Sequence, residues 1–125
     1  MIFHLAIPAR SLVESFAFYK KLGARHGRAT EQAIVMDFHG HQVVLHKTDY
    51  IDQNPQMYPR HFGFIYEKLE DVEQLYKRWG GTRFIFRPLF VRNKSQIAEH
   101  HTFFLKDPSN NLIEFKWYKN RNGLF

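Results

Sequence analysis

The sequence predicts an α+β domain of two βαβββ modules whose sheets form a curved, cup-shaped, partly closed mixed sheet. A β-prone segment followed by an amphipathic helix occurs at the start of the chain and again after residue 60. Short β-prone segments follow each helix. A βαβββ unit cannot cover its own sheet face, so two units are expected to join their sheets around one concave site.

In the first half, Pro8 is expected to end the first strand. Ser11 and Glu14 have the spacing of a capping box, and Gly23 supplies a helix stop. A His39-Gly40-His41 turn separates two β-prone runs and predicts a hairpin. The expected elements are a strand over residues 2–7, a helix between residues 11 and 23, and strands over residues 33–38 and 42–46.

A polar loop and a second copy of the same order fill the rest of the chain. His4 and His61 occupy corresponding strand positions, 57 residues apart (61 minus 4). We therefore expect one domain over residues 1–125, with a first repeat at about 1–47, a connecting loop at about 48–60 and a second repeat at about 61–118. The expected elements of the second repeat are strands over residues 61–66, 83–86, 101–105 and 112–117, a helix over 71–79 and a turn over 107–111.

The composition fits one folded domain. The 125 residues are 44% hydrophobic and 17% aromatic, which is enough for one core. No run approaches the roughly 18 apolar residues of a membrane span, and the N-terminus does not resemble a signal peptide. We therefore expect a cytoplasmic protein without a membrane partner. The absence of cysteine excludes disulfides, thiolate metal sites and a cysteine nucleophile.

The net charge of +6 raises the question of an anionic partner. The basic residues are scattered, apart from Lys20-Lys21 and residues 116–121, and no RNA-binding pattern of glycine and aromatic residues accompanies them. We therefore expect a small-molecule substrate in preference to a nucleic acid, and the positive charge would suit an anionic one.

Four polar residues stand within or beside apolar strands: His4, His46, His61 and Glu114. Imidazole nitrogens and one carboxylate oxygen are the donors that a divalent transition metal prefers. A lone strand histidine is more often a hydrogen-bonded core or surface residue, so each one alone is weak evidence. Glu114 leaves two orientations open: inward with a compensating partner, or outward beside Lys116.

Three segments resemble a known family: the opening residues 3–8, the block His61-Phe62-Gly63, and residues 104–115 with their Asp-Pro-x-x-Asn-x-x-Glu pattern. They are similar to the glyoxalase/bleomycin resistance/extradiol dioxygenase family, the vicinal oxygen chelate superfamily. The resemblance spans nearly the whole chain. One departure is Asn110, where the family usually has glycine; asparagine also tolerates the left-handed conformation of such a turn.

The resemblance implies a metal site with His4, His61 and Glu114 as ligands. In the glyoxalase I branch a fourth ligand comes from the strand before the central loop, and the matching position is taken here as His46. One divalent ion is implied: Fe(II), Ni(II), Zn(II) or Mn(II). Glu114 is the candidate base, and His101, one of two adjacent histidines of which one should face inward, is a candidate acid or base.

The implied function is metal-dependent chemistry on a small molecule with two adjacent oxygens, as in an isomerase, a lyase or a ring-cleaving dioxygenase. The alternative is a metal-free protein that binds and sequesters a drug or metabolite between aromatic walls. The family also implies a homodimer, in which a swapped arrangement can build each site from two chains.

Overall fold

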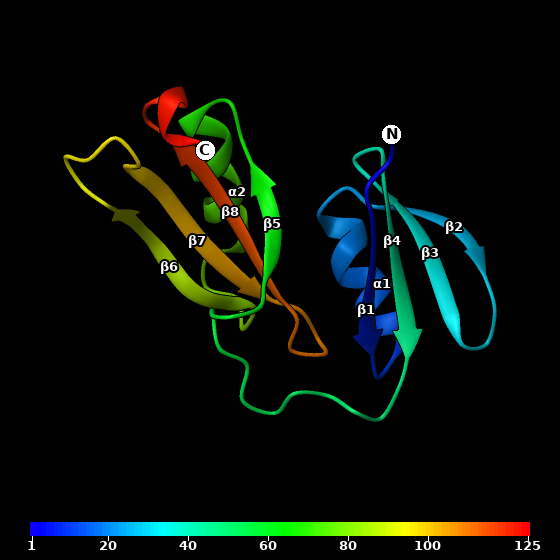
Figure 1. Ribbon diagram of the computed structural model, residues 1–125. Helices are drawn as coiled ribbons and strands as arrows, with labels where there is room; N and C mark the ends of the chain where they lie inside the picture. The colour runs from blue at the N-terminus through cyan, green and yellow to red at the C-terminus, as the bar shows by residue number, and fades with distance from the viewer. The chain divides into compact units, whose positions relative to one another are not determined.

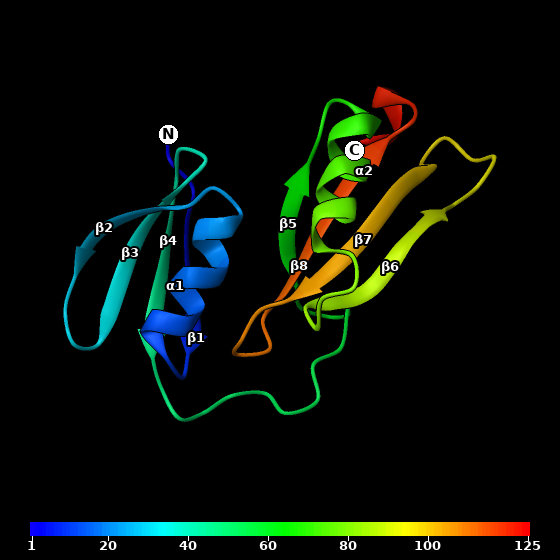
Figure 2. The ribbon, with the colours of Figure 1, turned by 180° about the vertical axis from the view of Figure 1, so that it is seen from behind.

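The computed structural model describes residues 1–125, which fold into two βαβββ modules (Figures 1 and 2). The elements are β1 (His4–Ala9), α1 (Leu12–Lys21), β2 (Arg25–Ala29), β3 (Ala33–Phe38), β4 (His41–Lys47), β5 (Phe62–Ile65), α2 (Leu69–Trp79), β6 (Ile85–Arg92), β7 (His100–Lys106), β8 (Leu112–Tyr118) and the 3-10 turn η1 (Arg121–Gly123). Neither helix is long and apolar enough to span a membrane.

The chain divides into two compact units. The first contains Met1–Pro55 and Asp107–Asn111, and the second contains Gln56–Lys106 and Leu112–Phe125. The sheet of the first unit has the order β1-β4-β3-β2, and the sheet of the second has the order β5-β8-β7-β6. In each sheet the first and last strands of the module are parallel neighbours, and the other pairs are antiparallel. The predicted α+β fold with two βαβββ modules is confirmed.

The local signals around α1 act as the sequence predicts. Ser11 is the N-cap, and its hydroxyl accepts a hydrogen bond from the Glu14 amide at 3.2 Å. Gly23 has a φ of +99°, a conformation that glycine adopts without steric cost. The predicted turn at residues 39–40 also forms, with positive φ at both positions.

Three strands differ most from the prediction. The strand expected over residues 83–86 is β6, which covers Ile85–Arg92 and continues past Pro88 at the edge of its sheet. β1 continues through Pro8 to Ala9, because β1 is an edge strand and a missing amide costs no ladder hydrogen bond on the open side. β2 was not predicted: its five residues are all exposed and mostly polar, so no hydrophobic alternation marks them. Pairing with β3 forms this strand despite its composition.

Each helix covers one face of its own sheet with apolar side chains. In the first unit Tyr19 of α1 packs against Phe38, with ring centroids 5.7 Å apart. In the second unit Tyr76 of α2 lies 5.2 Å from the ring of Phe103, which in turn stacks on Phe115 at 5.3 Å. Because successive side chains of a strand point to opposite faces, every second residue of these strands lies on the sheet face that does not contact the helix.

The turn between β7 and β8 belongs to the first unit, where it anchors α1 and β1. The buried Asp107 carboxylate accepts hydrogen bonds from the Tyr19 hydroxyl at 2.6 Å and from the backbone amides of Ser109 and Asn111 at 2.8 and 2.9 Å. The Asn111 side-chain amide donates to Asp107 and also to the Pro8 carbonyl. Burial raises the pKa of Asp107, and these hydrogen bonds oppose that rise. The left-handed φ expected for Asn110 is confirmed at +65°.

Replacing Tyr19 with Phe tests this anchor. The Tyr19→Phe protein keeps the ring but loses one donor to a buried carboxylate, so we expect its free energy of unfolding to fall by about 1.5–3 kcal/mol. Urea unfolding followed by circular dichroism measures the change. Tyr50→Phe is the control because Tyr50 is exposed. A loss for Tyr19→Phe as small as the control's would contradict a stabilising role.

Gly63 on β5 lets that strand approach Glu114 on β8. Gly63 and Glu114 are partners in the parallel ladder, and a Cβ added at Gly63 would lie 1.8 Å from the Glu114 carbonyl oxygen. Gly63→Ala must therefore push β5 away, and we expect a loss of about 3 kcal/mol or more. The control is Gly81→Asn, in open space at a φ of +77° that asparagine tolerates. Equal unfolding free energies for the two variants would refute the close approach.

Candidate functional site

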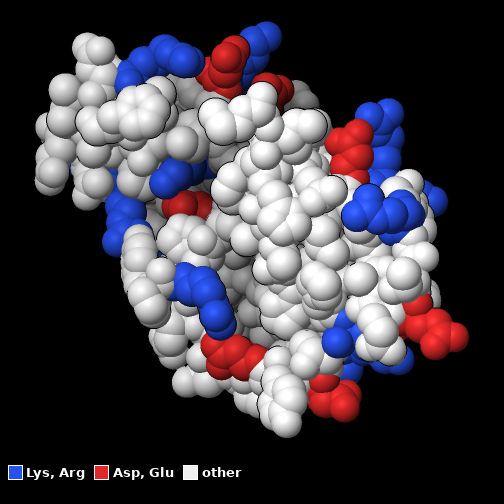
Figure 3. Space-filling view, turned by 45° about the vertical axis from the view of Figure 1, so that its right-hand side comes forward, with Lys and Arg blue, Asp and Glu red and all other residues white.

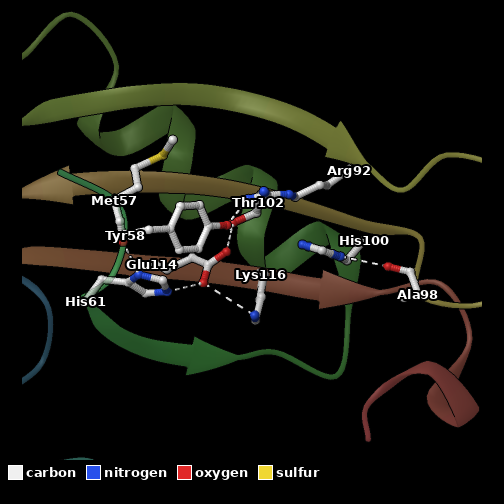
Figure 4. A network of polar contacts seen from close by, with 9 residues as sticks. All are labelled: Met57, Tyr58, His61, Arg92, Ala98, His100, Thr102, Glu114 and Lys116. Atoms are coloured by element: carbon white, nitrogen blue, oxygen red, sulfur yellow. Dashed lines mark hydrogen bonds and ion pairs between the residues drawn. The ribbon is translucent and has the colours of Figure 1, made fainter.

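The candidate site is centred on Glu114, a buried carboxylate on β8 of the second unit (Figure 4). Its Oε1 accepts a hydrogen bond from the Thr102 hydroxyl at 2.7 Å. Its Oε2 lies 3.0 Å from Nε2 of His61 and 3.3 Å from Nζ of Lys116. A carboxylate loses several kcal/mol of hydration on burial, and these three partners compensate for that loss.

The structure resolves the two orientations left open for Glu114. Glu114 shares a face with Lys116, as the outward alternative proposed, whereas Ile113 and Phe115 point to the α2 side. Yet the Glu114 side chain is only 6% exposed. Its face of the sheet is therefore not a solvated surface, and the carboxylate still needs partners.

His61 is held with its Nε2 toward Glu114. Its Nδ1 lies 2.6 Å from the Met57 carbonyl oxygen, which can only accept, so Nδ1 carries a proton. In a neutral ring Nε2 then presents a lone pair, as histidine ligands do when another group binds their second nitrogen. A lone pair facing a carboxylate oxygen at 3.0 Å is repulsive unless a proton lies between the two atoms, on the ring or on the carboxyl group, or a cation lies beside both.

The donor pair fits a divalent metal. Two donors about 2.1 Å from one ion and about 90° apart around it are about 3.0 Å from each other, which matches the separation of Nε2 and Oε2. No group of three or more His, Asp or Glu side chains gathers closely enough in this structure to hold an ion. His61 and Glu114 are thus a matched pair of donors within the second unit.

His4, the third expected ligand, belongs to β1 of the first unit. Its Nδ1 lies 2.6 Å from Oε1 of Gln42, its partner on β4. The amide oxygen can only accept, so His4 also carries its proton on Nδ1 and presents Nε2. Gln42 was not identified from the sequence, because only the register of β1 with β4 brings it beside His4.

His46 is separated from His4 along the same sheet. It pairs with Pro8 and Ala33, four residues beyond Gln42, or about 13 Å along the strand. Gln42, rather than His46, is therefore the β4 side chain next to His4.

The adjacent histidines on β7 point to opposite faces. His101 pairs with Trp117, and their rings lie 5.4 Å apart on the α2 side of the sheet, away from Glu114. His100 shares the face of Thr102 and Glu114, where it is buried and its Nδ1 donates to the Ala98 carbonyl at 2.8 Å (Figure 4). His100 therefore takes the inward place expected of His101, with Nε2 as a proton acceptor.

A cavity of about 400 Å³ lies elsewhere in the second unit, lined by residues that include Trp117 and Phe125 but neither His61 nor Glu114. It contains none of the candidate metal ligands. Basic side chains do not form a continuous patch on the face seen in Figure 3, where lysine and arginine are scattered among acidic and uncharged residues.

Comparison with known proteins agrees with this fold. The family model of the Glyoxalase/Bleomycin resistance protein/Dioxygenase superfamily matches residues 1–115. A crystal structure of a glyoxalase/bleomycin resistance protein/dioxygenase from Alicyclobacillus acidocaldarius is 42% identical, with a TM-score of 0.91 over 100% of this chain and 96% of that chain.

Two more distant structures share the fold. The fosfomycin resistance protein FosX from Listeria monocytogenes is 17% identical, with a TM-score of 0.79 over 99% of this chain and 98% of its own. Lactoylglutathione lyase from Agrobacterium tumefaciens is 18% identical, with a TM-score of 0.68 over 94% and 92%. No curated protein matches the sequence. On the family match and the 42% identical relative, the chain belongs to the glyoxalase/bleomycin resistance protein/dioxygenase superfamily.

Proposed function

We propose that the protein is a divalent-metal-dependent enzyme that acts on a small molecule with two adjacent oxygens. His61 and Glu114 supply two ligands, and His4 supplies the third, from the same chain or from a second copy in a homodimer. The observation that carries the proposal is the 3.0 Å approach of Nε2 of His61 to Oε2 of Glu114 with the His61 proton fixed on Nδ1. Membership of a superfamily whose members typically use divalent metals supports it.

The chain's own residues have separable roles in this chemistry. When bound, the metal ion acts as a Lewis acid that stabilises negative charge on the two substrate oxygens. Glu114 holds Oε1 in a hydrogen bond with Thr102, which orients the carboxylate and leaves Oε2 as the ligand or base. His100 can accept a substrate proton at Nε2, since its Nδ1 is bound to Ala98.

A metal-free binding protein is the second candidate, and one observation favours it. The Lys116 ammonium already lies 3.3 Å from the same Glu114 oxygen that faces His61. A lysine in this position can neutralise the carboxylate without a metal, so the two candidates differ in what Oε2 of Glu114 binds.

Metal titration separates the two candidates. Untagged protein is freed of metal and titrated with Mn(II), Fe(II), Ni(II) and Zn(II) by calorimetry, with elemental analysis for stoichiometry. We expect near-stoichiometric binding of at least one ion, weakened at least 100-fold in His61→Ala and Glu114→Gln because each removes a ligand; this corresponds to about 2.7 kcal/mol.

His26→Ala is the matched control, since His26 is an exposed strand histidine bound to its neighbouring backbone carbonyl. It should bind metal like the unmodified protein. Absence of binding for every ion, or equal affinities for Glu114→Gln and the control, would reject the metal enzyme and leave the binding protein.

Gln42→Leu tests the place of His4 in the site. If His4 is a ligand, the loss of the amide oxygen that holds its Nδ1 should weaken metal binding about 10- to 100-fold. The Gln53→Leu variant, an exposed glutamine in the connecting loop, is the control. Unchanged metal affinity in both Gln42→Leu and His4→Ala would remove His4 from the ligand set.

A further inference from the structure

We propose that Arg92 and Lys116 form a subsite for an oxyanionic group of the substrate, next to the position of its adjacent oxygens. The subsite is built from side chains of the second unit alone. It deepens the proposed function and rests on that function only for the chemistry at Glu114. The shared ligand chemistry is a negatively charged oxygen group such as a phosphoryl or carboxyl group.

The strand register brings the two cations to one face. Arg92 on β6 pairs with His100, and Lys116 on β8 pairs with Thr102, two residues along β7 from His100. Their Cα atoms are about 12 Å apart, because β7 lies between β6 and β8 and the two positions are offset by two residues along the strands. Each side chain extends about 6 Å, so the two charged ends can reach the same small anion. Figure 4 shows Arg92, His100 and Lys116 around this part of the sheet face, beside Glu114.

Arg92 lacks a carboxylate partner. Its guanidinium contacts the Tyr58 hydroxyl, and its centre lies 5.0 Å from the Tyr58 ring centroid. These contacts use one donor and hold the planar group in place, while the other donors stay free. Glu99, the buried acid near the end of β6, is paired with Lys119 at 3.3 Å. A pre-positioned guanidinium with free donors binds oxyanions at low entropic cost.

The charge balance of this face favours an anionic ligand. Arg92 and Lys116 contribute two positive charges and Glu114 one negative charge, which leaves a formal +1. A divalent ion on Glu114 would raise the sum to +3 and draw the carboxylate away from Lys116. An anionic substrate group relieves that excess, and it binds Lys116 in place of the Glu114 oxygen.

Exposure and spacing define the kind of substrate. The Lys116 side chain is 23% exposed, whereas that of Glu114 is 6% exposed, so a ligand from solvent meets the ammonium first. Lys116 lies two residues along β8 from Glu114, a separation of about 6.7 Å. The substrate class is therefore a small molecule whose anionic group lies a few bonds from its two adjacent oxygens.

The test measures anion binding to metal-free protein by amide chemical-shift titration with inorganic phosphate and, separately, with acetate. We expect at least one of these probes to bind at millimolar concentrations and to shift the amides of residues on β6 and β8. Arg92→Met and Lys116→Met should each weaken binding about 10-fold or more, and Lys116→Arg should restore most of it. Lys77→Met, on the exposed side of α2, is the control and should bind normally.

A Zn(II)-loaded sample adds a second readout, in which the anion affinity should rise because the net positive charge is larger. The metal-free titration does not depend on metal binding, so the subsite can hold even when the metal proposal fails. Failure of both phosphate and acetate to bind, or undiminished binding by the Arg92→Met/Lys116→Met double variant, would overturn the subsite. Tighter binding of phosphate than acetate identifies a phosphoryl-type group, and the reverse order identifies a carboxyl-type group.

Discussion

A carboxylate taken out of water needs other partners, and the second unit is organised around this requirement at Glu114. β5 lies close to β8 only because Gly63 has no side chain, and this approach brings His61 to Oε2 of Glu114. β7 contributes the Thr102 hydroxyl to Oε1. The same strands bury α2 against their other face, so the packing that stabilises the sheet also fixes the donor set.

Asp107 and Glu114, two buried carboxylates seven residues apart, show how one segment serves both units. Asp107 accepts four hydrogen bonds, all from Tyr19, Ser109 and Asn111 of the first unit. With every oxygen satisfied by neighbouring groups, it has no capacity for a ligand and acts as a structural anchor. Glu114 instead faces Nε2 of His61 and the flexible Lys116 side chain, and either contact can give way to a cation. The number of hydrogen bonds already made to each carboxylate therefore distinguishes Asp107, the structural acid, from Glu114, the candidate functional acid.

Most of the fold could be predicted because its signals are local. The Ser11 cap, the stop at Gly23 and the alternation of β8 each depend on a few neighbouring residues. β2 could not be predicted, since its exposed polar residues carry no pattern. Within the site, His61 and Glu114 were identified, but the strand register decides the other positions. It places Gln42, not His46, beside His4, and it places His100, not His101, on the sheet face that carries Glu114. A shift of one residue in a strand reverses its faces, and a single sequence does not fix that register.

His4, His61 and His100 share an arrangement that composition cannot reveal. In each ring Nδ1 lies within 2.8 Å of an oxygen that can only accept: that of Gln42, Met57 or Ala98. The proton is therefore fixed on Nδ1, and Nε2 of each neutral ring is left to bind a cation or accept a proton. His4 on β1 and His61 immediately before β5 share this polarity across the two modules, so each ring leaves Nε2 as an electron-pair donor. The exposed His26 has the same kind of anchor, at the Gly27 carbonyl, so the anchor alone does not mark a ligand; the buried Glu114 oxygen 3.0 Å from Nε2 is what distinguishes His61.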